Sequence, residues 1–124
     1  MPESRDKKGM VYNSQPNPNK KDWMLDVEVQ IGNEKKSTRG GTGLGIYYLK
    51  QIEASSHMES AFGYSNRYEG LGIYLNTLIK SERGSKNEIT NAIQGFYNDG
   101  NKILNIYKEK GHICYKKFRN LPPD

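Results

Sequence analysis

A regular alternation of apolar and polar residues constrains the fold of this chain more than any other feature of its sequence. Between residues 23 and 31 every second residue is apolar, namely Trp23, Leu25, Val27, Val29 and Ile31. Successive side chains of a β-strand point to opposite faces, so a period of two is typical of a strand that buries one face. We therefore expect residues 23–31 to form a half-buried strand with its apolar side inward.

Two later segments carry the same motif, Gly-Leu-Gly-Ile-Tyr, at the start of residues 43–49 and of residues 70–75. Nearly continuous apolar runs of this length are typical of strands that are buried on both faces. Glycines inside such runs leave room for a neighbouring layer or mark a bend. The sequence therefore predicts two further strands, each buried on both faces.

The sequence Asn-Asp-Gly-Asn at residues 98–101 separates two apolar runs, residues 92–97 and 102–107. Asp-Gly between two apolar runs is a strong hairpin signal, because glycine adopts a positive φ without a Cβ clash. Residues 89–96 also place apolar side chains at helical spacing. The turn that follows at once favours a strand, so we expect a β-hairpin here.

Short strands, glycine-rich turns and the lack of alternating helices favour an all-β fold, an antiparallel β-sandwich. Apolar residues make up only 34% of the chain and the mean hydropathy is -0.91, which is more polar than a self-sufficient core allows. We expect residues 1–22 to be a flexible polar lead in which residues 10–12 fit a short edge strand. Residues 23–124 would be an internal segment of one larger domain.

The formal net charge of +5 would suit an acidic partner, but the basic residues are scattered as short lysine pairs. Such pairs are typical of solvated strand ends, so we expect no specific binding of nucleic acid. No stretch is long and apolar enough for a membrane span, and the first residues are unlike a signal peptide. We therefore expect contact with a membrane only through segments outside this chain.

Five stretches of the sequence carry motifs that occur in the same order in one known family. They are Lys8-Gly9-Met10-Val11-Tyr12, Trp23 with Val27-Glu28-Val29, Gly41-Thr42-Gly43-Leu44-Gly45-Ile46-Tyr47-Tyr48, Phe62-Gly63 followed by residues 70–75, and Cys114 with Phe118-Arg119-Asn120. Together they resemble the L-type lectin domain of the mannose-binding cargo receptors that act between endoplasmic reticulum and Golgi. The resemblance runs from Lys8 to Asn120.

This resemblance implies a concanavalin-like jelly roll, of which the chain would form part, in a protein that is not an enzyme. It implies a lectin-like domain in the lumen of the endoplasmic reticulum and Golgi, with a single-pass membrane parent protein. The implied partner is glycoprotein cargo or a related receptor subunit. Cys114 is the sole cysteine, and in the family this cysteine pairs with one outside the range of this chain. Taken alone, it also fits a small buried hydrophobe.

The family binds mannose through a calcium ion, and this chain differs at most positions of that site. The positional equivalents of the family's Ser, Asp, Asp, aromatic and Asn residues are, in that order, Asp6, Thr42, Asn76, Leu78 and Lys80. Calcium prefers several carboxylate oxygens, and the ammonium group of Lys80 repels the ion. We therefore expect no cofactor, no metal at these degenerate positions, and weak or absent mannose binding.

One hypothesis is that the charge of Lys80 replaces the metal and holds the neighbouring loop through Asn76 or Glu109. Glu109 is the only acidic residue between positions 108 and 111, where the resemblance places the family's histidine and second calcium aspartate. The plainer interpretation is that Lys80 is a solvated loop residue.

Other functions fit the sequence less well. The glycine cluster of residues 40–45 lacks the spacing and the following helix of a phosphate-binding loop. Asp26 and Glu28 share one strand face as a glycosidase pair would, but their neighbours are typical of a solvent-exposed face. His57 and His112 have no cysteine or aspartate at metal-ligand spacing. The serious alternative to a working lectin is a protein-interaction module that no longer binds sugar.

Overall fold

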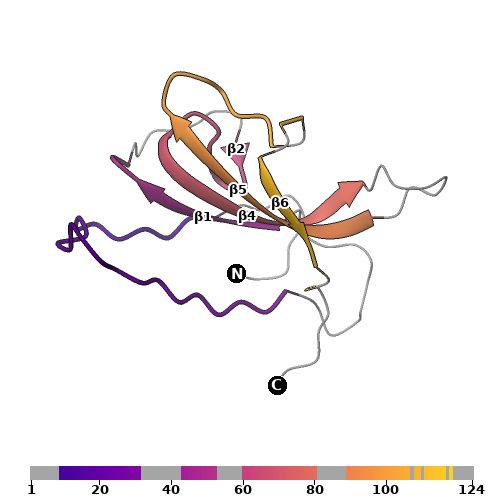
Figure 1. The fold of residues 1–124 in the computed structure, drawn as a ribbon, viewed down its shortest axis with the longest axis horizontal. Helices are drawn as coiled ribbons and strands as arrows, with labels where there is room; N and C mark the ends of the chain where they lie inside the picture. Colours follow the sequence, from indigo (N-terminus) through magenta and orange to yellow (C-terminus); the bar gives the residue numbers. More distant parts are fainter. Residues whose placement is uncertain are drawn as a thin grey trace.

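The computed structural model describes residues 9–31, 43–52, 60–80, 89–106, 108–109, 111–116 and 118 (Figure 1). Its strands are β1 (Gly43–Leu49), β2 (Ser60–Ala61), β3 (Tyr64–Ser65), β4 (Glu69–Lys80), β5 (Ile89–Asp99) and β6 (His112–Tyr115). The described residues form no helix, and hence none that could cross a membrane. The prediction of an all-β fold is confirmed.

One antiparallel sheet, in the order β1-β4-β5-β6, makes up most of the fold, and β2 pairs with β3 separately. Residues 43–49 coincide with β1, and residues 70–75 lie within β4, so both predicted strands are confirmed. Residues 89–96 lie within β5, which confirms a strand rather than a helix there. The long β4–β5 pair forms the centre of the sheet (Figure 1).

The two copies of Gly-Leu-Gly-Ile-Tyr lie side by side and fit into each other. In the β1–β4 register, Tyr47 lies opposite Gly72 and Tyr74 lies opposite Gly45. Directly opposite side chains share a face, so the two glycines and the two tyrosines lie on the same side of the sheet. A Cβ atom at Gly45 would lie only 2.8 Å from the ring of Tyr47 on the same strand. A Cβ atom at Gly72 would lie only 2.5 Å from Tyr68 Oη and 2.7 Å from Tyr74 Oη. The glycines thus make room for a layer of tyrosines.

This tyrosine layer is the centre of the core, on one face of the sheet. The buried core residues are Tyr64, Tyr68, Tyr74, Phe96, Leu104 and Ile106, with Tyr47, Leu49 and Phe62 packed against them. The hydroxyl of Tyr74 donates a hydrogen bond to Tyr68 Oη at 2.8 Å. Burial raises the pKa of Tyr47, Tyr68 and Tyr74 above the usual 10.0, so these phenols stay neutral.

The opposite face of the sheet is less well covered than its sequence predicts. Tyr48 is 44% exposed and Leu71 is 40% exposed, although both belong to runs that we expected to be buried on both faces. That expectation is wrong for this face. An extended segment, residues 23–31, passes below the sheet as a separate layer (purple in Figure 1). Its Trp23 ring lies 4.4 Å from the Tyr48 ring, centroid to centroid.

Residues 23–31 are extended, but the predicted half-buried strand is wrong. Residues 23–30 join no strand ladder, and only Ile31 makes an isolated bridge. Leu25 is 60% exposed, and the other apolar residues of residues 23–30 are exposed as well. The physical reason is that no described strand lies beside this segment to cover its edges and its apolar side chains. Residues 10–12 carry no strand either.

The predicted hairpin at residues 98–101 is also wrong in its second arm. Gly100 has the expected positive φ of 88°, but β5 pairs with β6 rather than with residues 102–107. The described part of that run forms no strand, because Leu104 and Ile106 turn their side chains into the core instead. The chain between β5 and β6 is therefore a loop that packs on the tyrosine layer.

Candidate functional site

The residues that the resemblance places at the sugar and calcium site divide into three groups. Asp6 and Thr42 lie outside the described residues. The backbones of Leu78 and Lys80 lie in the last part of β4. Asn76 is described in full and is completely buried on the face of β4 that carries the tyrosine layer.

One described partner of Asn76 is the amide of Gln94. Its Nδ2 donates a hydrogen bond to Gln94 Oε1 at 3.5 Å, and Gln94 Nε2 donates to the carbonyl oxygen of Ile106 at 2.9 Å. Gln94 is 2% exposed, so this chain of hydrogen bonds is closed to solvent. Buried polar groups must be paired, and here the pairing links β4, β5 and the loop after β5. Asn76 therefore bonds to the amide of Gln94, which ties the loop to the sheet.

A β-bulge separates Asn76 from Lys80. Asn76 pairs with Ala92, whereas Ile79 pairs with Thr90, so β4 holds one more residue than β5 between these two pairs. In a regular strand, positions two and four residues apart share a face. The extra residue breaks this alternation. Backbone positions 76 and 80 therefore do not lie on the same face of β4, and so they do not belong to one common site.

Glu109 is bound by Lys102. The carboxylate accepts from Lys102 Nζ at 2.8 Å through Oε2, and from the backbone N–H of Asn105 at 3.2 Å through Oε1. The hydrogen bond from Lys102 holds the pKa of Glu109 below its usual value, and the same bond raises the pKa of Lys102. The described partners of Glu109 are thus Lys102 and Asn105. The side chain of Lys80 lies outside the described part of the structure, so the hypothesis about Lys80 stays a prediction.

The other sequence candidates lie apart from one another. Cys114 is exposed on β6, and His112 is exposed at the start of the same strand. Asp26 and Glu28 are exposed on the extended segment, and His57 lies outside the described residues. Within the described part of the chain, no group of three or more His, Cys, Asp or Glu side chains is placed to hold a metal ion.

Sequence reasoning missed the buried amides of β5. Gln94 and Asn98 alternate with apolar neighbours, and both point to the tyrosine layer. Asn98 Nδ2 donates to the carbonyl oxygen of Lys102 at 2.9 Å, as Gln94 does to Ile106. The signal was their spacing of four residues on one strand face. We had interpreted Gln94 as part of an apolar run and Asn98 as part of the turn that follows it.

The model of the legume-like lectin family matches residues 1–122 of the sequence. No curated protein and no solved structure matches the chain. The all-β structure with its antiparallel sheet agrees with the β-sandwich that this family implies. A match over nearly the whole sequence identifies the relationship, and the chain belongs to the legume-like lectin family.

Proposed function

We propose that this chain is the lectin-like domain of a secretory-pathway cargo receptor in which the calcium-dependent mannose site has been replaced. Its partner is glycoprotein cargo or a related receptor subunit, in the lumen of the endoplasmic reticulum and Golgi. Membership of the legume-like lectin family supports a carbohydrate-binding domain, and such families are generally without catalytic activity. The motif order in the sequence supports the cargo-receptor branch.

One observation carries the proposed loss of calcium. Asn76, at the position of a calcium-binding aspartate, is completely buried and hydrogen-bonded to the amide of Gln94. Calcium takes six to eight oxygen ligands, several of them carboxylates. Glu109, the acidic residue nearest to the expected second ligand position, is neutralised by Lys102. These contacts support a domain in which neither residue binds calcium.

Several protein groups hold the described part of the loop after β5. On the sheet side, the amides of Gln94 and Asn98 bind the carbonyl oxygens of Ile106 and Lys102. Further bonds come from the neighbouring segment, where the backbone N–H of Leu104 donates to Asn66 O at 2.8 Å and Arg67 Nε donates to Gly100 O at 3.0 Å. These bonds supply the order that a bound ion gives to a loop, which supports a domain that folds without calcium.

The direct test is isothermal titration of the domain with a high-mannose glycan, in calcium and in excess chelator. The proposal predicts weak or absent binding, with the same affinity in both conditions. Micromolar binding that disappears on addition of chelator would contradict it.

A second function, a protein-interaction module that no longer binds sugar, is favoured by the exposed apolar face of the sheet. Tyr48, Leu71 and the extended segment around Leu25 leave apolar surface open to a protein partner. Treatment of the cargo glycoprotein with an endoglycosidase separates the two functions. Capture that survives removal of the glycans supports the protein-interaction module, and capture that is lost supports the lectin.

A further inference from the structure

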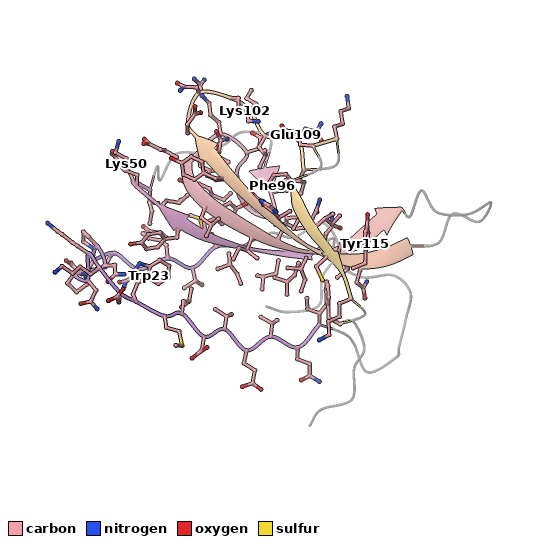
Figure 2. The ribbon with its side chains drawn as sticks, in the orientation of Figure 1. Trp23, Lys50, Phe96, Lys102, Glu109 and Tyr115 are labelled. Carbon is pink, nitrogen blue, oxygen red and sulfur yellow. The ribbon has the colours of Figure 1, made fainter. Side chains whose placement is uncertain are left out.

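The turn at the end of β5 contains two neighbouring residues that can react with each other. Asp99-Gly100 is the sole Asp-Gly pair in the sequence, and Asp99 is exposed at the last position of β5. In such a pair the backbone nitrogen of the glycine can attack the side-chain carboxyl group, because glycine has no Cβ atom to hinder the approach. In Figure 2 this turn lies at the outer end of β5, next to the labelled Lys102. The end of β5 is therefore a candidate site of chemical modification.

The reaction within an Asp-Gly pair needs no reactant other than water. The Gly100 nitrogen forms a bond to Cγ of Asp99, and the hydroxyl of the protonated carboxyl group leaves as water together with the amide proton. The product is a five-membered succinimide ring. Water then adds to one of the two ring carbonyl carbons and breaks its bond to nitrogen. Addition at Cγ restores aspartate, whereas addition at the backbone carbonyl carbon gives isoaspartate, in which the chain continues through Cγ.

Two hydrogen bonds oppose this reaction in the folded protein. The backbone N–H of Gly100 donates to Asn98 Oδ1 at 3.1 Å, so a different side chain holds the attacking nitrogen. Oδ1 of Asp99 accepts from the backbone N–H of Asn101 at 2.9 Å. This second bond lowers the pKa of Asp99, and an ionised carboxylate reacts poorly with a nucleophile. Both reacting groups are thus bonded to other partners.

Asn98 is itself fixed in place. It is completely buried, and its Nδ2 donates to the carbonyl oxygen of Lys102 at 2.9 Å, so its amide bonds to the turn on both sides. Arg67 adds a further bond, from its Nε to the carbonyl oxygen of Gly100 at 3.0 Å. The nitrogen of Gly100 can therefore reach the carboxyl group of Asp99 only after the turn opens.

We propose that Asp99-Gly100 is a site of spontaneous isoaspartate formation that Asn98 keeps unreactive in the folded domain. The site becomes reactive when the turn and the loop after β5 leave the sheet. Isoaspartate adds one carbon atom to the backbone of the turn, which separates Gly100 from Asn98 and Arg67 and keeps the loop from binding again as before. This inference does not depend on the lectin function.

The test is incubation of the full chain in ¹⁸O-labelled water at neutral pH, followed by digestion in ordinary water and mass spectrometry of the peptides. Each ring opening adds one ¹⁸O atom to residue 99, whichever product forms. We expect slow labelling of the folded protein and labelling about tenfold faster or more in urea, because the reaction passes through local opening. Asp22, which precedes the bulky Trp23, is the internal control and should stay unlabelled in both conditions.

Three variants assign the effect to named groups. Asn98→Ala removes the acceptor for the Gly100 N–H and is expected to speed labelling of the folded protein about fivefold, as for the loss of one hydrogen bond. Arg67→Gln loosens the turn from an exposed position and is expected to speed labelling about twofold. The matched control is Asp99→Glu, which keeps the carboxylate but would have to form a six-membered ring, so its labelling should disappear even in urea.

Circular dichroism first establishes that each variant is folded, and Arg67→Gln carries the comparison if Asn98→Ala is not. Faster labelling in urea and in the folded variants, with none in Asp99→Glu, supports the proposal. Equal rates for folded and unfolded wild type, or folded variants that label as slowly as the wild type, would show that these bonds do not protect the site. Absence of labelling in urea would show that the pair is unreactive, which also overturns the proposal.

Discussion

Replacing Gly70 with alanine is expected to lower the free energy of unfolding by about 3 kcal/mol, which is a large part of the stability of a small domain. Gly70 has a φ of 144°, which residues with a side chain rarely adopt, and a Cβ atom there would collide with the carbonyl oxygen of Tyr48. That oxygen belongs to the paired backbone of β1, so it cannot move aside without breaking the β1–β4 ladder.

Gly95→Ala is the matched control for this substitution. Gly95 lies on β5 in the same sheet, and a Cβ atom there meets nothing within 4 Å. Alanine at this position is expected to be neutral or stabilising by up to about 1 kcal/mol, because it reduces the entropy of the unfolded chain. Urea unfolding followed by circular dichroism measures both variants. Equal midpoints for Gly70→Ala and wild type would show that β1 does not pack on β4 as described.

Phe96→Ala is expected to lower the free energy of unfolding by about 3–5 kcal/mol. Phe96 is buried in the core, its ring centroid lies 5.9 Å from that of Tyr74, and Gly111 packs against it. Removing the ring leaves a cavity that the hydrogen-bonded loop above it cannot fill by moving. Both the sheet and the loop should lose stability together.

The neighbouring substitution Tyr97→Ala tests whether the effect belongs to one face of β5. Tyr97 is 71% exposed and points to the opposite face, so its loss should change the unfolding free energy by no more than about 0.5 kcal/mol. The same urea experiment compares the two variants. A larger effect for Tyr97→Ala than for Phe96→Ala would mean that the core lies on the other face of the sheet.

The sequence was sufficient to predict β1, β4 and β5, because their apolar runs and glycines are local signals. It was also sufficient to predict the family, through the order of short motifs. Residues 23–31 show what such local signals cannot predict, namely whether a segment pairs with another strand. Their period of two describes how the side chains alternate, and it holds in the extended segment. Whether a second strand lies beside them depends on distant residues, and none is described there.

The hairpin shows a second limit of local signals. Gly100 does turn the chain, but in the residues after it the burial of Leu104 and Ile106 contributes more to the free energy of folding than pairing with β5 would. What makes this possible is the pair of buried amides, Gln94 and Asn98, which satisfy the backbone of the loop. A sequence shows that an amide is present but not which carbonyl oxygen it meets. The candidate site was therefore less predictable than the sheet.

Thermal unfolding in calcium and in excess chelator tests most directly whether protein groups alone hold this lectin-like domain together. Because Asn76 is bonded to Gln94 and Glu109 to Lys102, we expect the same melting temperature in both conditions. A ligand that binds only the folded state must stabilise it. A melting temperature that rises with calcium concentration would contradict the account.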